Sequence, residues 1–225
     1  MNHKRIALII PHTDITLETD LQNYLPNHYV IHTQRIWLDD VSEFAEKKMV
    51  DIDLPKGIQY LKDITAFDAA IFGCTSASAV YGIKGLKRIE QQLSDELGCK
   101  SISAFGGVLR EVNKLQAKKI ALFTPYTKTV NQFMIHSLKD FGVNVVYSNG
   151  LGLINDSEIC KVKPSHIYTF IHNHRNDLKQ TEADLCFISC TNFRAMEIRE
   201  DLEDLLNMRV ITSNYCIHTF ILDCD

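Results

Sequence analysis

The stretch KRIALIIPHT at residues 4–13 is echoed by KKIALFTPYT at residues 118–127, about half the chain later. A second pair repeats in the same order and at nearly the same separation, FDAAIFGCTS at residues 67–76 and ADLCFISCTN at residues 183–192. Each member of this second pair ends an apolar run with Cys-Thr and a small polar residue. The repeat predicts two similar halves about a pseudo-twofold axis, with Cys74 and Cys190 facing each other across one cleft.

The composition is that of an ordinary globular protein with a substantial core. Of the 225 residues, 45% are hydrophobic and 23% charged, and the formal net charge is −4. Such a charge attracts neither nucleic acid nor an anionic membrane surface, so we expect neither as a partner. No apolar run approaches the ~18 residues that span a bilayer. The cysteines are odd in number, seven, and scattered, which favours reduced thiols in a cytoplasmic protein.

Short β-rich runs alternate with longer amphipathic segments, which is typical of an α/β fold with parallel sheets. In the first half we expect strands at Arg5–Ile10, Tyr29–His32, Ala69–Phe72 and Ser101–Ser103. In the second half the expected strands are Lys119–Phe123, Asn144–Tyr147, Leu185–Ser189 and Arg209–Thr212. The main expected helices are Leu17–Tyr24, Ile83–Leu97, Val130–Phe141 and Ile167–Lys179.

The expected domain division follows the repeat. Residues 1–113 together with 210–225 form the N-terminal half, and residues 114–209 form the second half. Pro11 and Pro125 are expected to end the first strand of each half. Ligands bind outside the carboxyl ends of parallel strands. All the repeated loops lie at such ends, so the sequence predicts a site between the halves.

Cys74 and Cys190 are the leading candidates for catalysis. Each follows a predicted strand and precedes a helix-forming segment, and a thiol at a helix N-terminus is expected to have a lowered pKa. A lone free cysteine is more often a packing residue, but two cysteines at matched positions of a repeat favour chemistry. The polar side chains that follow them either cap a helix or bind a carboxylate. They are Thr75, Ser76, Thr191 and Asn192.

The sequence gives no sign of a metal or cofactor site. His172 and His174 are two residues apart in a predicted helix, so they point to different faces. The glycines are dispersed, and no phosphate-binding glycine motif follows the first strand. We therefore expect no metal and no cofactor.

The motifs at residues 73–76, 189–192 and 124–126 together resemble the aspartate/glutamate racemase superfamily. The resemblance is greatest to the branch that holds maleate cis-trans isomerase and arylmalonate decarboxylase. It implies two flavodoxin-like (Rossmann-type) domains with parallel sheets, an active site between them, no cofactor and a homodimer. It also implies that Cys74 and Cys190 are the catalytic pair. The carboxylate contacts that it implies are Thr75, Ser76, Tyr126 and Thr191.

Two positions depart from the maleate isomerase pattern. Asp14 and Asp156 stand where that branch tends to carry Asn, although Asn155 is adjacent to the second position. An ionised carboxylate cannot donate a hydrogen bond to a substrate carboxylate as an amide does, so we expect weak or no activity on maleate. Asp14 either orients a cysteine proton, meets a substrate ammonium or caps the helix at Leu17. The predicted substrate-binding set is completed by Asp14, Asn155, Asp156 and Asn192.

The function expected is a cofactor-independent racemase or isomerase of a small carboxylate, either an amino acid or a dicarboxylate. One thiolate removes a proton, or adds to a double bond, and the other thiol protonates from the opposite face. Three alternatives stay open. They are maleate cis-trans isomerisation proper, decarboxylation of the arylmalonate type, and a non-enzymatic small-carboxylate sensor.

Overall fold

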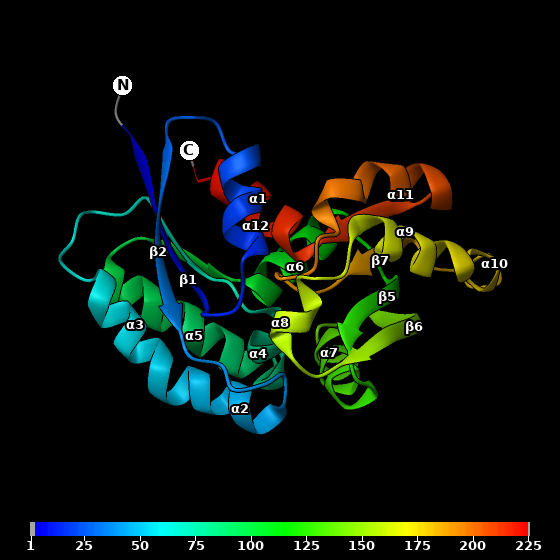
Figure 1. Ribbon diagram of the computed structural model, residues 1–225, viewed down its shortest axis with the longest axis horizontal. Coiled ribbons are helices and arrows are strands. Elements are labelled where there is room, and N and C mark those ends of the chain that lie inside the picture. Colours follow the sequence, from blue (N-terminus) through cyan, green and yellow to red (C-terminus); the bar gives the residue numbers. More distant parts are fainter. Residues whose placement is uncertain (1–2, 225) are drawn as a thin grey trace.

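The computed structural model describes residues 3–224 and contains two four-stranded parallel sheets (Figure 1). The strand order is β2-β1-β3-β4 in the first sheet and β6-β5-β7-β8 in the second. The matching order confirms the α/β class and the duplication. The first sheet is formed by β1 Lys4–Pro11, β2 Tyr29–Ile36, β3 Ala69–Phe72 and β4 Lys100–Ser103. The second is formed by β5 Lys119–Tyr126, β6 Asn144–Leu153, β7 Leu185–Ile188 and β8 Arg209–Thr212.

The helices include several that the sequence did not predict, three of them between β2 and β3. The first half carries α1 Thr16–Tyr24, α2 Glu43–Lys48, the π-helix η1 Met49–Asp53, α3 Leu54–Leu61, α4 Thr75–Val80, α5 Gly82–Leu97 and α6 Ala104–Lys114. The second half carries α7 Lys128–Asp140, α8 Asp156–Ile159, α9 Pro164–Asn173, α10 Arg175–Leu178, the 3-10 helix η2 Met196–Ile198, α11 Arg199–Leu206 and α12 Ser213–Leu222. The single helix expected at 167–179 is wrong, because the chain breaks at His174 into α9 and α10.

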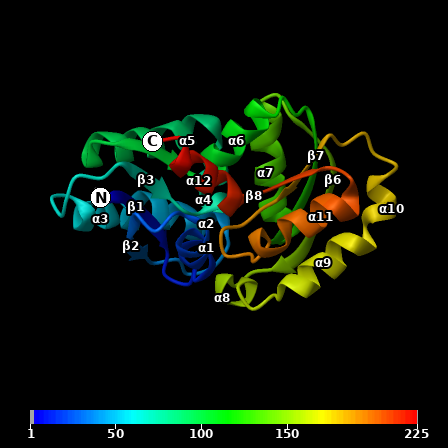
Figure 2. The same ribbon diagram turned by 90° about the horizontal axis from the view of Figure 1, so that it is seen from above.

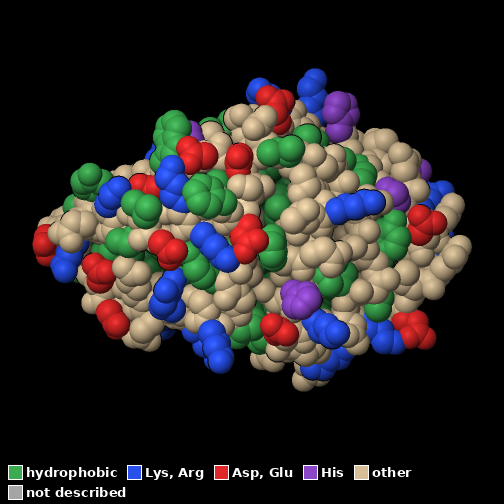
Figure 3. Space-filling view, turned by 90° about the horizontal axis from the view of Figure 1, so that it is seen from below, with side chains coloured by type: hydrophobic (Ala, Val, Ile, Leu, Met, Phe, Trp, Pro, Cys, Tyr) green, Lys and Arg blue, Asp and Glu red, His purple; other side chains and the backbone are tan. Residues whose placement is uncertain are grey.

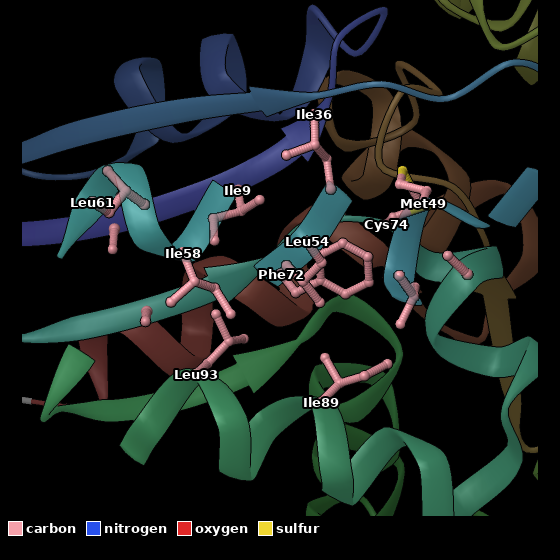
Figure 4. Packing of buried hydrophobic residues seen from close by; sticks show 14 of the residues in the cluster. Ile9, Ile36, Met49, Leu54, Ile58, Leu61, Phe72, Cys74, Ile89 and Leu93 are labelled. Atoms are coloured by element: carbon pink, nitrogen blue, oxygen red, sulfur yellow. The ribbon is translucent and has the colours of Figure 1, made fainter. Parts of the chain in front are cut away.

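Both faces of each sheet are covered by helices, as the continuous apolar strands require. On β1, Ile6, Leu8 and Ile10 face the core shared with α1 and α12. The alternate residues Ala7 and Ile9 face the core formed by α2, α3 and α5. Figure 4 shows this second core, in which side chains of α3 and α5 pack against the sheet.

The last helix of each half packs against the other half. Helix α6 follows β4, yet Val108 and Val112 share a core with Ile120 and other residues of the second sheet. Helix α12 follows β8, yet its apolar side chains share a core with β1 and α1. Figures 1 and 2 show α12 beside α1 and α6. The halves are therefore tied together by exchanged helices, and the exact domain division stays a prediction.

One strand end differs from expectation. Pro11 is the last residue of β1, as predicted, but β5 continues through Pro125 and ends at Tyr126. The β5–β6 ladder shifts register between Thr124 and Tyr126. Since the missing N–H of Pro125 falls at this irregularity, the strand continues without losing a regular ladder bond.

The surface agrees with the small net charge. Figure 3 shows Lys and Arg side chains interspersed with Asp and Glu over one face. Within residues 3–224, every helix is too short or too polar to cross a membrane.

Gly150 lies on β6 beside the end of β5, where Tyr126 is the last residue. A Cβ there would lie 2.5 Å from the Tyr126 carbonyl oxygen and 2.7 Å from Nδ2 of Asn131. We therefore expect Gly150→Ala to lower the free energy of unfolding by about 1–3 kcal/mol, measured by urea denaturation.

Gly107→Ala in α6 is the matched control. Its added Cβ would meet neighbouring atoms only at ordinary contact distances, the nearest at 3.5 Å. Since alanine is the better helix former, this variant should be unchanged or more stable by about 0.5–1 kcal/mol. Equal unfolding free energies for the two variants would contradict the crowding at Gly150.

Candidate active site

The two candidate cysteines lie at the carboxyl ends of β3 and β7, where the halves meet. Cys74 and Cys190 are 5% and 6% exposed. Cys74 is the N-cap residue of α4 and follows Gly73. A Cβ at Gly73 would lie 2.5 Å from Cδ2 of Leu17 and 2.7 Å from Cγ2 of Ile10. A glycine at this position therefore lets the Cys74 turn approach β1 and α1 closely.

The two cysteine motifs are hydrogen-bonded into one site. The Thr191 hydroxyl donates to the Gly73 carbonyl at 3.2 Å. Ser213 Oγ accepts from the Thr75 hydroxyl at 2.9 Å and from the Cys190 N–H at 3.1 Å. The structure thus brings both repeated motifs together. Ser213, the first residue of α12, was not predicted; its only signal in the sequence was its place directly after the last predicted strand.

Cys190 has a backbone φ of +99°. This left-handed conformation is uncommon for a residue with a side chain and costs on the order of 1–3 kcal/mol. The chain turns here instead of entering a helix, and α11 begins only at Arg199, after η2. The expectation that Cys190 lies at a helix N-terminus is therefore wrong. Backbone strain of this kind clusters at functional sites.

The expected lowering of the thiol pKa is also wrong. Burial raises the pKa of both Cys74 and Cys190 well above the usual range. The charge of Glu46 raises the pKa of Cys74 further, and that of Asp156 does the same for Cys190. The N–H groups of Ala77 and Asn192 oppose these effects but do not offset them. Burial therefore favours the neutral thiol over the thiolate at both positions.

Tyr126 interacts with both cysteines from the end of β5. Its side chain is 1% exposed, and its hydroxyl lies close enough to Cys190 to favour the Cys190 thiolate. Burial, followed by the charge of Cys190, raises the pKa of Tyr126 well above its ordinary value, and the charge of Cys74 adds to the shift. The structure therefore places Tyr126 beside the cysteines, and its contact with a substrate stays a prediction.

Asp14 and Asp156 are buried and close enough to influence each other. Asp14 Oδ1 accepts the N–H groups of Thr16 and Leu17 at 2.9 and 3.0 Å, so it caps α1, while Oδ2 has no hydrogen bond. Burial and then the charge of Asp156 raise the pKa of Asp14 to about 7. Burial likewise raises the pKa of Asp156, although Thr13 donates to its Oδ2 at 2.6 Å.

Asn192 ties three loops together. Its Oδ1 accepts from Ile15 N–H and the Thr16 hydroxyl, each at 3.1 Å. Its Nδ2 donates to the Thr13 carbonyl at 3.1 Å and to Asp156 Oδ2 at 2.9 Å. All its polar atoms are engaged in this arrangement, so substrate contact by Asn192 stays a prediction. The same holds for Asn155, which is exposed while Asp156 beside it is buried.

Glu46 is a site residue that the sequence analysis missed. It lies on α2 and is fully buried beside Ser76. Its charge raises the pKa of Cys74 and of Tyr126. Burial raises its pKa to about 8. The sequence signal for helix α2 is short. It consists of a serine that caps the helix and of apolar residues at Ala45 and Met49, one helical turn apart, which are buried in the structure. Among residues 3–224, no cluster of three His, Cys, Asp or Glu side chains is suited to hold a metal ion.

The sequence of residues 6–217 matches the model of the arylmalonate decarboxylase family. A maleate isomerase of Geobacillus stearothermophilus is 24% identical over 225 residues, which is 94% of this chain and 87% of the relative. A maleate isomerase of Nocardia farcinica is 22% identical over 199 residues, 84% of this chain and 77% of the relative.

Solved structures share the fold over the whole chain. A maleate cis-trans isomerase of Nocardia farcinica, solved as a mutant with a covalently bound succinylcysteine intermediate, gives a TM-score of 0.89 at 19% identity. Unliganded arylmalonate decarboxylase gives 0.75 at 14% identity. Each comparison covers 98% of this chain and 92% of the other. These likenesses agree with two flavodoxin-like domains.

The conformation of Cys190 predicts that glycine at this position gives a more stable protein than alanine, the reverse of the usual order. At φ +99°, Cys190→Gly relieves strain that Cys190→Ala retains, so the glycine variant should be more stable by about 1 kcal/mol. Cys74 is the matched control, with φ −142°, where glycine should be less stable than alanine by about 0.5–1 kcal/mol. Urea unfolding of the four variants measures both differences. A glycine penalty at both positions would rule out strain at Cys190.

Proposed function

Because the chain belongs to the arylmalonate decarboxylase family, we propose that it is a cofactor-independent isomerase or racemase of a small carboxylate. In this proposal Cys74 and Cys190 act on opposite faces of one carbon centre. The observation that carries it is the interlock of two matched cysteine turns, one from each half, in a single buried site. Relatives at 22–24% identity are maleate isomerases, which belong to the class of isomerases proposed for this chain.

The reaction needs one thiolate and one thiol. In racemisation, the thiolate takes the α-proton and the opposite thiol returns a proton to the other face, so the two cysteines exchange roles in the reverse direction. The hydroxyl of Tyr126 supports the state in which Cys190 is the thiolate. In this proposal the Ser76 hydroxyl holds the substrate carboxylate and stabilises the charge that develops on it, and Thr75 joins it by turning its hydroxyl from Ser213 to the substrate.

Addition of a thiolate to a double bond is the second route within the same proposal. The solved Nocardia farcinica maleate isomerase carries a succinylcysteine, which is the product of such an addition in that protein. Decarboxylation needs only one thiol to protonate the intermediate. The retention of both cysteines in matched turns therefore favours isomerisation.

Access to the site requires movement of a covering segment, because both thiols are almost fully buried. The segment before α2 joins the other half through a hydrogen bond from Val41 N–H to the Ile154 carbonyl at 2.9 Å. The side chain of Val41 also packs in the core of the second half. Substrate entry in this proposal involves separation of such contacts.

Removal of either thiol tests the two-cysteine proposal. We expect Cys74→Ser and Cys190→Ser each to reduce turnover by about 10²–10⁴-fold, because each face of the carbon centre loses its proton carrier. The measurement is mass-spectrometric detection of deuterium at the α-carbon after incubation in heavy water with amino acids, hydantoins and dicarboxylates. Cys99→Ser, a cysteine outside the site, is the control and should keep native turnover. Near-native activity of both site variants would make the cysteines structural, and a severe loss in only one would favour decarboxylation.

The two aspartates predict weak activity on maleate. A dianion beside Asp14 and Asp156 meets like charges in a site with little water. We expect the native protein to convert maleate to fumarate slowly or not at all, and Asp14→Asn with Asp156→Asn to increase the rate by about tenfold or more. Fumarate formation followed by chromatography measures both. Efficient conversion by the native protein would overturn the expectation.

A further inference from the structure

Helix α2 places a carboxyl group without a partner against the cysteine site. Glu46 is 0% exposed, and neither of its carboxyl oxygens has a hydrogen bond. Among residues 3–224, no lysine, arginine or histidine lies within ion-pair distance of it. A buried carboxyl group normally has a partner, since an unsatisfied one costs free energy of desolvation.

The groups around Glu46 belong to the proposed site. Ser76 lies beside the carboxyl group and favours its ionised form, and the charge of Glu46 raises the pKa of Cys74 and of Tyr126. Ser76 in turn contacts the Cys74 thiol, with 3.9 Å between Oγ and Sγ. The carboxyl group is therefore one side chain away from a thiol that the proposed function assigns to catalysis.

Three negative charges act on Glu46. Asp156, Asp40 and Glu43 each raise its pKa by charge repulsion. A ligand that brings a second carboxylate to this end of the site adds to the repulsion. A ligand that brings an ammonium group relieves it and satisfies the free oxygens through charge-assisted hydrogen bonds.

We propose that Glu46 is a substrate-contacting specificity residue, which accepts hydrogen bonds from an ammonium group near the substrate carboxylate. The inference rests on the proposed function and narrows it to carboxylates that carry an ammonium group, such as amino acids. In this arrangement the hydroxyl side chains hold the carboxylate, the cysteines flank the reacting carbon, and Glu46 holds the nitrogen. The apolar core contacts of this segment come instead from Ala45 of α2 and from Met49, which begins η1.

The experiment compares each α-amino acid of a panel with its N-acetyl derivative, and adds maleate. Each pair shares the carboxylate and the α-hydrogen, but only the free amino acid has an ammonium. Binding is measured by isothermal titration calorimetry and turnover by deuterium uptake at the α-carbon in heavy water. The variants are Glu46→Gln and the control Glu43→Gln, an exposed residue on the same helix.

We expect native protein to prefer at least one free amino acid over its N-acetyl derivative. Glu46→Gln should reduce that preference at least tenfold, and Glu43→Gln should preserve it. An unchanged preference in Glu46→Gln, or an equal loss on every substrate, would overturn the role of Glu46. Turnover of maleate or N-acetyl compounds alone would reject the inference and keep the proposed function. Binding of amino acids without any turnover would reject the proposed function and keep the role of Glu46 in recognition. Binding of no panel member would reject both the proposed function and the role of Glu46.

Discussion

The contact between the two cysteine turns is the constraint on which the rest of the site depends. The hydroxyl of Thr191 reaches the backbone before Cys74, and Ser213 joins Thr75 to the backbone of Cys190. These bonds cross between sheets that are otherwise separate. Because the same turns carry the thiols, the interlock that holds the halves together also fixes the relative positions of the two candidate proton carriers.

The electrostatics of the site follow mainly from the burial of its ionisable groups. Asp14, Glu46 and Asp156 are each at most 9% exposed, and burial is the first cause of the raised pKa of all three. Their charges in turn raise the pKa of the thiols. A site of this kind binds a proton or a cation more readily than another anion. A site with Asn side chains at these positions would differ, because an amide donates hydrogen bonds to a dianion and adds no negative charge of its own.

The sequence contained most of the framework and only part of the site. The duplicated apolar strands predicted both sheets, and the repeated Cys-Thr predicted the residues that meet between them. The remainder depends on tertiary contacts without a local pattern. Helix α2 is a six-residue helix, too short for a clear apolar period, so Glu46 was missed. The turn at Cys190 has a φ that its own side chain disfavours, and the sequence therefore predicted a helix where the structure has a strained turn.

The exchange of the last helices limits how such a closed site can open. Rotation of whole halves would remove α6 from the core of the second sheet and α12 from the core of the first, and it would expose apolar surface in both. Residues 41–48 meet the second half through a smaller set of contacts, including the Val41–Ile154 hydrogen bond. Movement of this segment is the less costly way to admit a ligand. Since it also carries Glu46, a ligand held by that carboxyl group would favour the closed position, so recognition of the nitrogen and exclusion of water would occur together.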